Sequence, residues 1–146
     1  MKYGSHIFEK KAFWVVQKYL ESNPAVEDYA HKNVLDLLKE NMAKAIVLDA
    51  KDIPSDSVQL YCFVTVKSVS GWQETFQLVL PNEEDIKKNR FSVMGSLGAL
   101  VIGISEGDTL IYGLPGNIMS LKIEKVKQKM TRDMSEEDLN HLYKIN

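Results

Sequence analysis

A chain of 146 residues with 45% apolar and 26% charged side chains is long enough for one domain with a buried core. Its 18 basic and 20 acidic side chains give a net charge of −2, which argues against broad nonspecific affinity for nucleic acid, and no direct sequence-specific binding is expected either. No apolar run approaches the roughly 18 residues of a membrane span, and the charges near the start do not fit a signal peptide. The single cysteine, Cys62, cannot form an internal disulfide, which favours an intracellular, cytoplasmic location.

Two amphipathic segments open the chain. In residues 7–21, apolar side chains recur at spacings of three and four, which predicts a helix. Asn23 followed by Pro24 is typical of a capped helix start, and a second helix is predicted from there to about residue 45. Together they predict a short antiparallel hairpin, similar to a coiled coil, over residues 1–50. Its two apolar faces comprise Phe8, Ala12, Val15, Val16 and Tyr19 on the first helix, and Leu35, Leu38, Met42 and Ala45 on the second.

The apolar period then changes to two. Residues 58–66 and 72–80 alternate between apolar and polar side chains around a Ser-Gly turn, which predicts an antiparallel β-hairpin with Trp72 and Phe76 on its inner face. After the charged loop PNEEDIKKNR, the remaining pattern predicts a strand at 91–94, a helix at 97–104, a strand at 109–114, a last strand through Leu121 and Ile123, and a tail helix within 129–146. The sequence therefore predicts an α+β chain divided into residues 1–50, 51–128 and 129–146.

Candidate catalytic and metal-binding residues are few. A zinc site usually includes at least one close pair of ligands, whereas His6, His31 and His141 are far apart in the sequence. Cys62 lies in an apolar strand pattern, without the neighbouring base that a nucleophilic thiol needs. The sequence contains neither a phosphate-binding loop nor a nucleophile elbow. We therefore expect a protein that is not an enzyme and that holds no metal and no cofactor.

Acidic residues near the expected hairpin tip leave one catalytic role open. Glu21, Glu27 and Asp28 could help a partner protein to hold Mg²⁺, which is often bound by one or two carboxylates together with ligands from elsewhere. The simpler interpretation is structural, because Glu27 and Asp28 fall in the first turn of a predicted helix, where acidic side chains complement the helix dipole.

The segment FSVMGSLGALVIGISEGDTLIYGLPG, residues 91–116, resembles the C-terminal domain of the Gre family of transcription elongation factors. The positions that match the family pattern in order and spacing are Ser92, Val93, Leu97, Gly98, Ile102, Gly103, Gly107, Asp108, Pro115 and Gly116. Upstream, DIPSDSVQLYCFVTVKS and FQLVLP are similar to the family's linker and first two strands. The resemblance covers residues 45–127.

The resemblance implies a fold like that of the FK506-binding proteins (FKBP-like), in which a twisted antiparallel sheet wraps around one helix. It implies RNA polymerase as the protein partner, bound at the rim of the secondary channel while the hairpin tip enters the channel. The implied docking loop consists of Met94, Gly95, Ser96 and Leu97. The implied tip consists of Glu21, Asn23, Pro24, Glu27 and Asp28. Gly95-Ser96 replaces the usual Ser-Pro or Ala-Pro, which gives this loop a freer backbone.

The short hairpin separates this chain from the transcript-cleavage factors of the family, which have a long coiled coil and an acidic tip motif. That motif is not recognisable at residues 21–28, and the layout is closer to the short-coil relative called regulator of nucleoside diphosphate kinase. The resemblance thus implies a polymerase-binding regulator without cleavage stimulation. The alternatives are a cleavage factor that uses its tip carboxylates and an FKBP-like module with another partner. The pocket of such a module would be lined by Tyr61, Phe63, Trp72, Phe76 and Tyr112.

Overall fold

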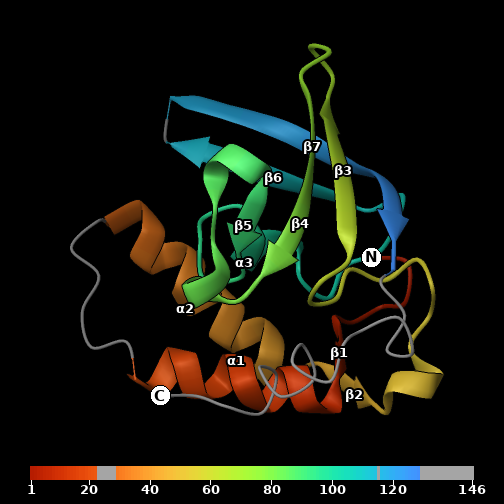
Figure 1. Cartoon of the computed structure of the whole chain (residues 1–146). Helices are drawn as coiled ribbons and strands as arrows, with labels where there is room; N and C mark the ends of the chain where they lie inside the picture. The colour runs from red at the N-terminus through yellow and green to blue at the C-terminus, as the bar shows by residue number, and fades with distance from the viewer. Residues whose placement is uncertain (23–28, 115, 129–146) are drawn as a thin grey trace.

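The computed structural model describes residues 1–22, 29–114 and 116–128 (Figure 1). Its elements are, in chain order, β1 (Ile7–Glu9), α1 (Lys10–Ser22), α2 (Tyr29–Ala43), β2 (Ile46–Leu48), η1 (Ala50–Asp52), β3 (Phe63–Ser68), β4 (Gln73–Val79), η2 (Pro81–Glu83), η3 (Ile86–Lys88), β5 (Arg90–Ser92), α3 (Gly98–Val101), β6 (Thr109–Leu114) and β7 (Asn117–Lys127). The predicted α+β class is confirmed. The predicted tail helix and four of the five tip residues, Asn23, Pro24, Glu27 and Asp28, lie outside the described residues.

Five strands form a curled mixed sheet in the order β5-β4-β3-β7-β6. The pairs β3–β4, β3–β7 and β6–β7 are antiparallel, whereas β5 runs parallel to β4. The expectation of an antiparallel sheet is therefore wrong at this edge. The physical reason is the segment between β4 and β5, which contains η2 and η3. It carries the chain back so that β5 runs beside the last three residues of β4, instead of reversing it in a tight hairpin.

The predicted first helix divides into a strand and a helix. Residues Ile7–Glu9 form β1, which pairs in parallel with β2, so that Ile7 lies opposite Ile46. Phe8 is fully buried on this strand and does not belong to the helix. The sequence concealed this boundary because Phe8 precedes Ala12 by four residues, which is also the spacing of one helical face.

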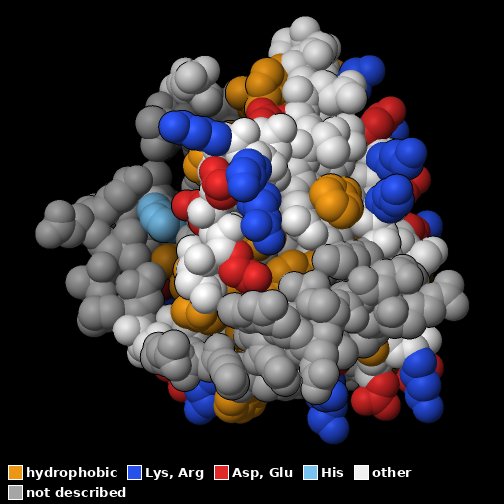
Figure 2. Space-filling view, in the orientation of Figure 1, with side chains coloured by type: hydrophobic (Ala, Val, Ile, Leu, Met, Phe, Trp, Pro, Cys, Tyr) orange, Lys and Arg blue, Asp and Glu red, His pale blue; other side chains and the backbone are white. Residues whose placement is uncertain are grey.

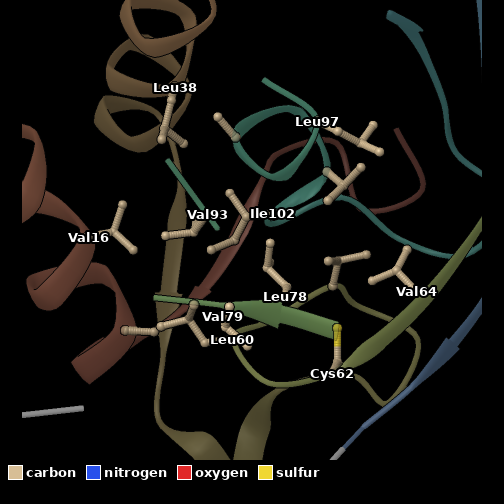
Figure 3. Packing of buried hydrophobic residues seen from close by; sticks show 14 of the residues in the cluster. Val16, Leu38, Leu60, Cys62, Val64, Leu78, Val79, Val93, Leu97 and Ile102 are labelled. Atoms are coloured by element: carbon tan, nitrogen blue, oxygen red, sulfur yellow. The ribbon is translucent and has the colours of Figure 1, made fainter. Parts of the chain in front are cut away.

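The helices share one apolar core with the sheet. Val15 and Val16 of α1 and Leu38 of α2 are almost completely buried, as the helical spacing predicts. Figure 3 shows Val16 and Leu38 pointing toward Val93 and other side chains around α3 and the sheet. Because α2 packs against both α1 and α3, the N-terminal helices are held against the sheet region as well as against each other.

The predicted strand over residues 58–66 begins only at Phe63. Before it, the chain pairs with the segment that follows α3: the N–H of Val58 donates to the carbonyl of Ile104 (2.8 Å), and the N–H of Gly103 donates to the carbonyl of Val58 (2.9 Å). Tyr61 has a left-handed backbone conformation with φ of 70°, which interrupts an extended strand. The apolar side chains before Phe63 are nevertheless buried.

A buried side-chain amide joins the N-terminal elements to the sheet region. Gln59 is 5% exposed; its Nε2 donates to the carbonyl of Ile7 (2.7 Å), and its Oε1 accepts from the N–H of Glu9 (3.0 Å). The same Nε2 donates to the hydroxyl of Ser57 (2.9 Å). Gln59 therefore takes the place of a second neighbouring strand along β1. Without it, two backbone groups would lose their partners away from water.

Helix α3 is shorter than the predicted helix 97–104. It ends at Val101, and Gly103, with φ of 87°, turns the chain back toward Val58. Its first residue, Gly98, touches β5: a Cβ there would lie 2.0 Å from the carbonyl oxygen of Ser92 and 3.0 Å from Leu78 Cδ1. Only glycine allows α3 to approach the sheet this closely.

We expect Gln59→Leu to lower the free energy of unfolding by about 1–3 kcal/mol, because the backbone groups of Ile7 and Glu9 would stay buried without partners. Urea denaturation followed by circular dichroism measures this change. Gln73→Leu, at an exposed position of β4, is the matched control and should change stability by at most about 0.5 kcal/mol. Equal stability of the Gln59→Leu and wild-type proteins would contradict the assigned role of the amide.

Gly98→Ala tests the close approach of α3 to β5, because two effects predict opposite signs. Helix propensity alone favours alanine by about 1 kcal/mol. The contact with the Ser92 carbonyl predicts a net destabilisation of about 1–3 kcal/mol, and we expect the contact to dominate. Gly95→Ala is the graded control, since its Cβ would lie 3.1 Å from the same oxygen. A higher melting temperature for Gly98→Ala would refute the steric argument.

Candidate functional site

A groove lies on the concave face of the sheet, beside the loop that precedes α3. Its volume is about 330 Å³, and its wall includes Gly95, Ser96, Leu97 and Gly98. The other lining residues come from the β3–β4 turn, β4, the segment between η2 and η3, η3, β5 and β6, namely Trp72, Glu74, Glu84, Ile86, Phe91, Ser92 and Tyr112. Helix α3, whose first residue Gly98 lines the groove, has only four residues.

The structure divides the four predicted docking residues into two kinds. Ser96 is exposed and Gly95 is half-buried, so both are accessible in the groove wall. Met94 and Leu97 are each 7% exposed and anchor the loop in the core. A docking partner would therefore contact Gly95 and Ser96, while the two apolar side chains hold them in place.

Hydrogen bonds fix the shape of this loop. The N–H groups of Met94 and Gly95 donate to the hydroxyl (3.0 Å) and the carbonyl (2.9 Å) of Ser92. The N–H of Ser92 in turn donates to the carboxylate of Glu84 (2.9 Å). From α2, His31 Nε2 donates to the carbonyl of Met94 (2.6 Å). The loop thus presents its exposed residues from a backbone that β5, η2–η3 and α2 hold on three sides.

Two of the five aromatic residues considered for a concave pocket line the groove. These are Trp72, which is 38% exposed, and Tyr112 of β6. Trp72 was expected on the inner face of the β-hairpin, together with Phe76; it lines the groove and remains partly accessible. Phe76 and Tyr61 are buried in the core, and Phe63 is 43% exposed.

Sequence reasoning missed Phe91, Glu74 and Glu84 as groove residues. Phe91 stacks on Phe76 with ring centroids 4.7 Å apart, so it continues the aromatic surface from the core into the groove. Glu74 carried a usable signal, because it is two residues from both Trp72 and Phe76 and so shares their side of the strand. Glu84 carried none, since the charged loop gave no indication of which of its carboxylates would turn toward β5.

The described residues do not assemble a catalytic centre from the sequence candidates. Burial raises the pKa of the Cys62 thiol to about 12, so the thiol is neutral at physiological pH and a poor nucleophile. His6 and His31 have different neighbours, Gly103 and Met94 respectively. Within the described ranges, no group of three histidine, cysteine or acidic side chains is arranged to hold a metal ion.

Glu21 is the one predicted tip residue that the structure describes. It is exposed on the last turn of α1, where its carboxylate lies 3.6 Å from Lys18 Nζ. At such an exposed site the ion pair contributes little to stability, so the carboxylate is available to a partner.

The visible surface carries charges of both signs. On the face shown in Figure 2, lysine and arginine side chains are interspersed with acidic ones. None of the described helices combines the length and the apolar composition needed to cross a lipid bilayer.

Comparison with known proteins assigns the part of the chain that contains the five-stranded sheet to a family. Residues 53–128, more than half of the chain, match the family described as "Transcription elongation factor, GreA/GreB, C-term". The transcription elongation factor GreA of Syntrophus aciditrophicus is 33% identical over 90 residues, which cover 61% of this chain and 56% of that protein. The GreA of Bradyrhizobium diazoefficiens is 27% identical over 124 residues, which cover 84% of this chain and 79% of that protein.

A solved structure supports the same fold. The prokaryotic transcription elongation factor GreA/GreB from Nitrosomonas europaea aligns with a TM-score of 0.69 at 21% identity, covering 85% of this chain and 98% of that one. At this identity the likeness establishes the fold alone. With the match over residues 53–128, it leads to one conclusion: the chain belongs to the GreA/GreB family, whose C-terminal domain it contains.

Proposed function

We propose that the chain regulates transcription elongation by binding RNA polymerase through the groove and the loop residues Gly95 and Ser96. The observation that carries this proposal is that an exposed Ser96 and a half-buried Gly95 lie on a hydrogen-bonded backbone, at the positions where the family resemblance expects the polymerase contact. The relatives' names, transcription elongation factor GreA, support the same function.

The rigidity of the loop suits a docking role. A segment that already has its bound conformation loses little conformational entropy on association, which favours affinity. Here the hydrogen bonds to Ser92, the contact from His31 and the close approach at Gly98 all restrict the loop. The usual proline of the family is absent at position 96, and we propose that these contacts replace the stiffness that it would supply.

We further propose the finer arrangement that the resemblance implies, an FKBP-like domain with a short antiparallel helical hairpin. The curled sheet around α3 and the pairing of β1 with β2 at the base of the two helices support it. The layout is compatible with closeness to the regulator of nucleoside diphosphate kinase.

The protein itself is proposed to catalyse no reaction and to leave transcript cleavage unstimulated. Helix α1 has 13 residues, which corresponds to roughly 20 Å at 1.5 Å per residue. Both helices also contribute to the core of the sheet region, so part of their length is used in packing. A short, partly embedded hairpin has little length left to extend into a channel.

The alternative is a cleavage factor in which Glu21, Glu27 and Asp28 assist the polymerase's Mg²⁺. The exposure of Glu21 at the end of α1 is the observation in its favour. A third possibility, an FKBP-like module for another partner, is supported by the aromatic side chains in the groove.

Ser96→Arg should weaken binding to core RNA polymerase by roughly tenfold or more, since a long charged side chain would occupy the proposed contact surface. Biolayer interferometry with immobilised polymerase measures the affinity, and an unchanged melting temperature shows that the variant is folded. Ser120→Arg, an equally exposed serine on β7, is the matched control and should bind normally. Unchanged affinity for Ser96→Arg would contradict this docking site.

Transcript cleavage on a stalled elongation complex separates the two polymerase-binding functions. We expect the protein to compete with a GreA factor for polymerase and to produce no cleavage. Cleavage that disappears when Glu21, Glu27 and Asp28 are changed to alanine would establish the alternative. The absence of both binding and competition would refute the polymerase as partner.

A further inference from the structure

We infer that the groove binds an arginine side chain presented by the partner protein. This inference rests on the proposed function only in taking RNA polymerase as that partner, because the chemistry of the groove is a property of this chain. It names the residue type that the groove recognises, which neither the fold nor the family membership specifies.

The first argument is charge. Glu74 and Glu84 line the groove, and among its described lining residues there is neither lysine nor arginine. The ion pairs recorded for the described residues, Lys2 with Asp56 and Lys18 with Glu21, involve neither groove carboxylate. Glu84 uses one carboxylate oxygen to accept the N–H of Ser92, which orients the group and leaves the second oxygen for a ligand.

The second argument is the aromatic and apolar character of the other residues that line the groove. Trp72, Phe91 and Tyr112 provide aromatic surface, over which a guanidinium group stacks favourably. Ile86, which is 60% exposed on η3, provides apolar surface for the methylene chain of the same side chain. The carboxylates can therefore pair with the charge of an arginine, the rings can stack on its guanidinium plane, and Ile86 can contact its methylene chain.

The third argument excludes other occupants. An anionic ligand would be repelled by two carboxylates. A purely apolar segment would cover Glu74 and Glu84 without pairing them, which costs free energy. Lysine satisfies the charge, but its compact ammonium group lacks the planar surface that stacks on the aromatic rings. A volume of about 330 Å³ is near the lower end of the range for ligand pockets and can accommodate one long side chain with its flanking backbone.

Trp72 provides a direct optical reporter for occupancy of the groove. The chain contains two tryptophans, and the other, Trp14, is 47% exposed on α1. Trp14→Phe therefore leaves Trp72 as the single tryptophan without removing a core side chain. The probes are capped pentapeptides with arginine, lysine, norleucine or glutamate between alanines, titrated into the Trp14→Phe protein.

We expect a saturable change in Trp72 emission with the arginine peptide, at a concentration roughly fivefold or more below that needed with lysine. The norleucine and glutamate peptides should give no saturable change. In the same background, Glu74→Gln with Glu84→Gln should weaken the arginine response by roughly tenfold. Glutamine at position 84 can still accept the Ser92 N–H, so the loop should keep its shape. Glu40→Gln with Glu124→Gln, at two exposed positions, is the matched control.

The outcomes for this inference and for the proposed function are distinguishable. An arginine response without polymerase binding would support the groove chemistry and refute the polymerase as partner. Polymerase binding that Ser96→Arg weakens, together with no arginine preference and no effect of the double glutamine variant, would overturn the inference and leave the proposed function standing. Equal responses to arginine, lysine and norleucine would also overturn it.

Discussion

The hydrogen bonds of the Gln59 side chain determine how the two halves of the described structure are joined. They attach the free edge of β1 to the segment that leads into the sheet, through the backbone of Ile7 and Glu9. Strand β1 directly precedes α1, and β2 follows α2. Because β1 pairs with β2, the same amide helps to position both helices. The N–H of Ile7 also donates to Gly103 beyond α3 (2.9 Å), so the helices and the groove share one support.

The groove lies where α3 packs closely against β5 while the rings of Trp72 and Tyr112 stay accessible. Gly98 allows α3 to lie against the Ser92 carbonyl, and Ser92 then organises the loop that carries Ser96. Because α3 ends after one turn, the outer part of the concave face keeps Trp72 and Tyr112 accessible. The proposed contact surface therefore combines the loop held by Ser92 with the accessible rings of the groove.

The sequence was informative wherever a local pattern had one structural solution. The strand at 109–114 has the predicted bounds, and the burial of Leu38 and Met42 follows the helical spacing. It was misleading where one spacing fits both a helix and a strand followed by a helix, as at Phe8, which lies four residues before Ala12. The expectation of an antiparallel sheet was wrong for the β4–β5 pair, and the sequence was silent on Glu84. Both depend on how the charged loop between β4 and β5 folds back. Matching a family pattern located the loop, but only the packing showed that Met94 and Leu97 face inward.

Because β1 and β2 pair in parallel, the length of helices α1 and α2 can change without altering how they are attached to the rest of the structure. The strand before α1 and the strand after α2 lie side by side, so the chain enters the two helices and returns from them at the same place. Residues inserted at the far ends of the helices would extend each by about 1.5 Å per residue while every contact of Gln59 and Gly98 stayed the same. Insertions of about seven residues in each helix would also keep their apolar faces aligned. The same pair of strands could therefore support helices of different lengths, and a change in helix length would leave the groove beside Gly98 unchanged.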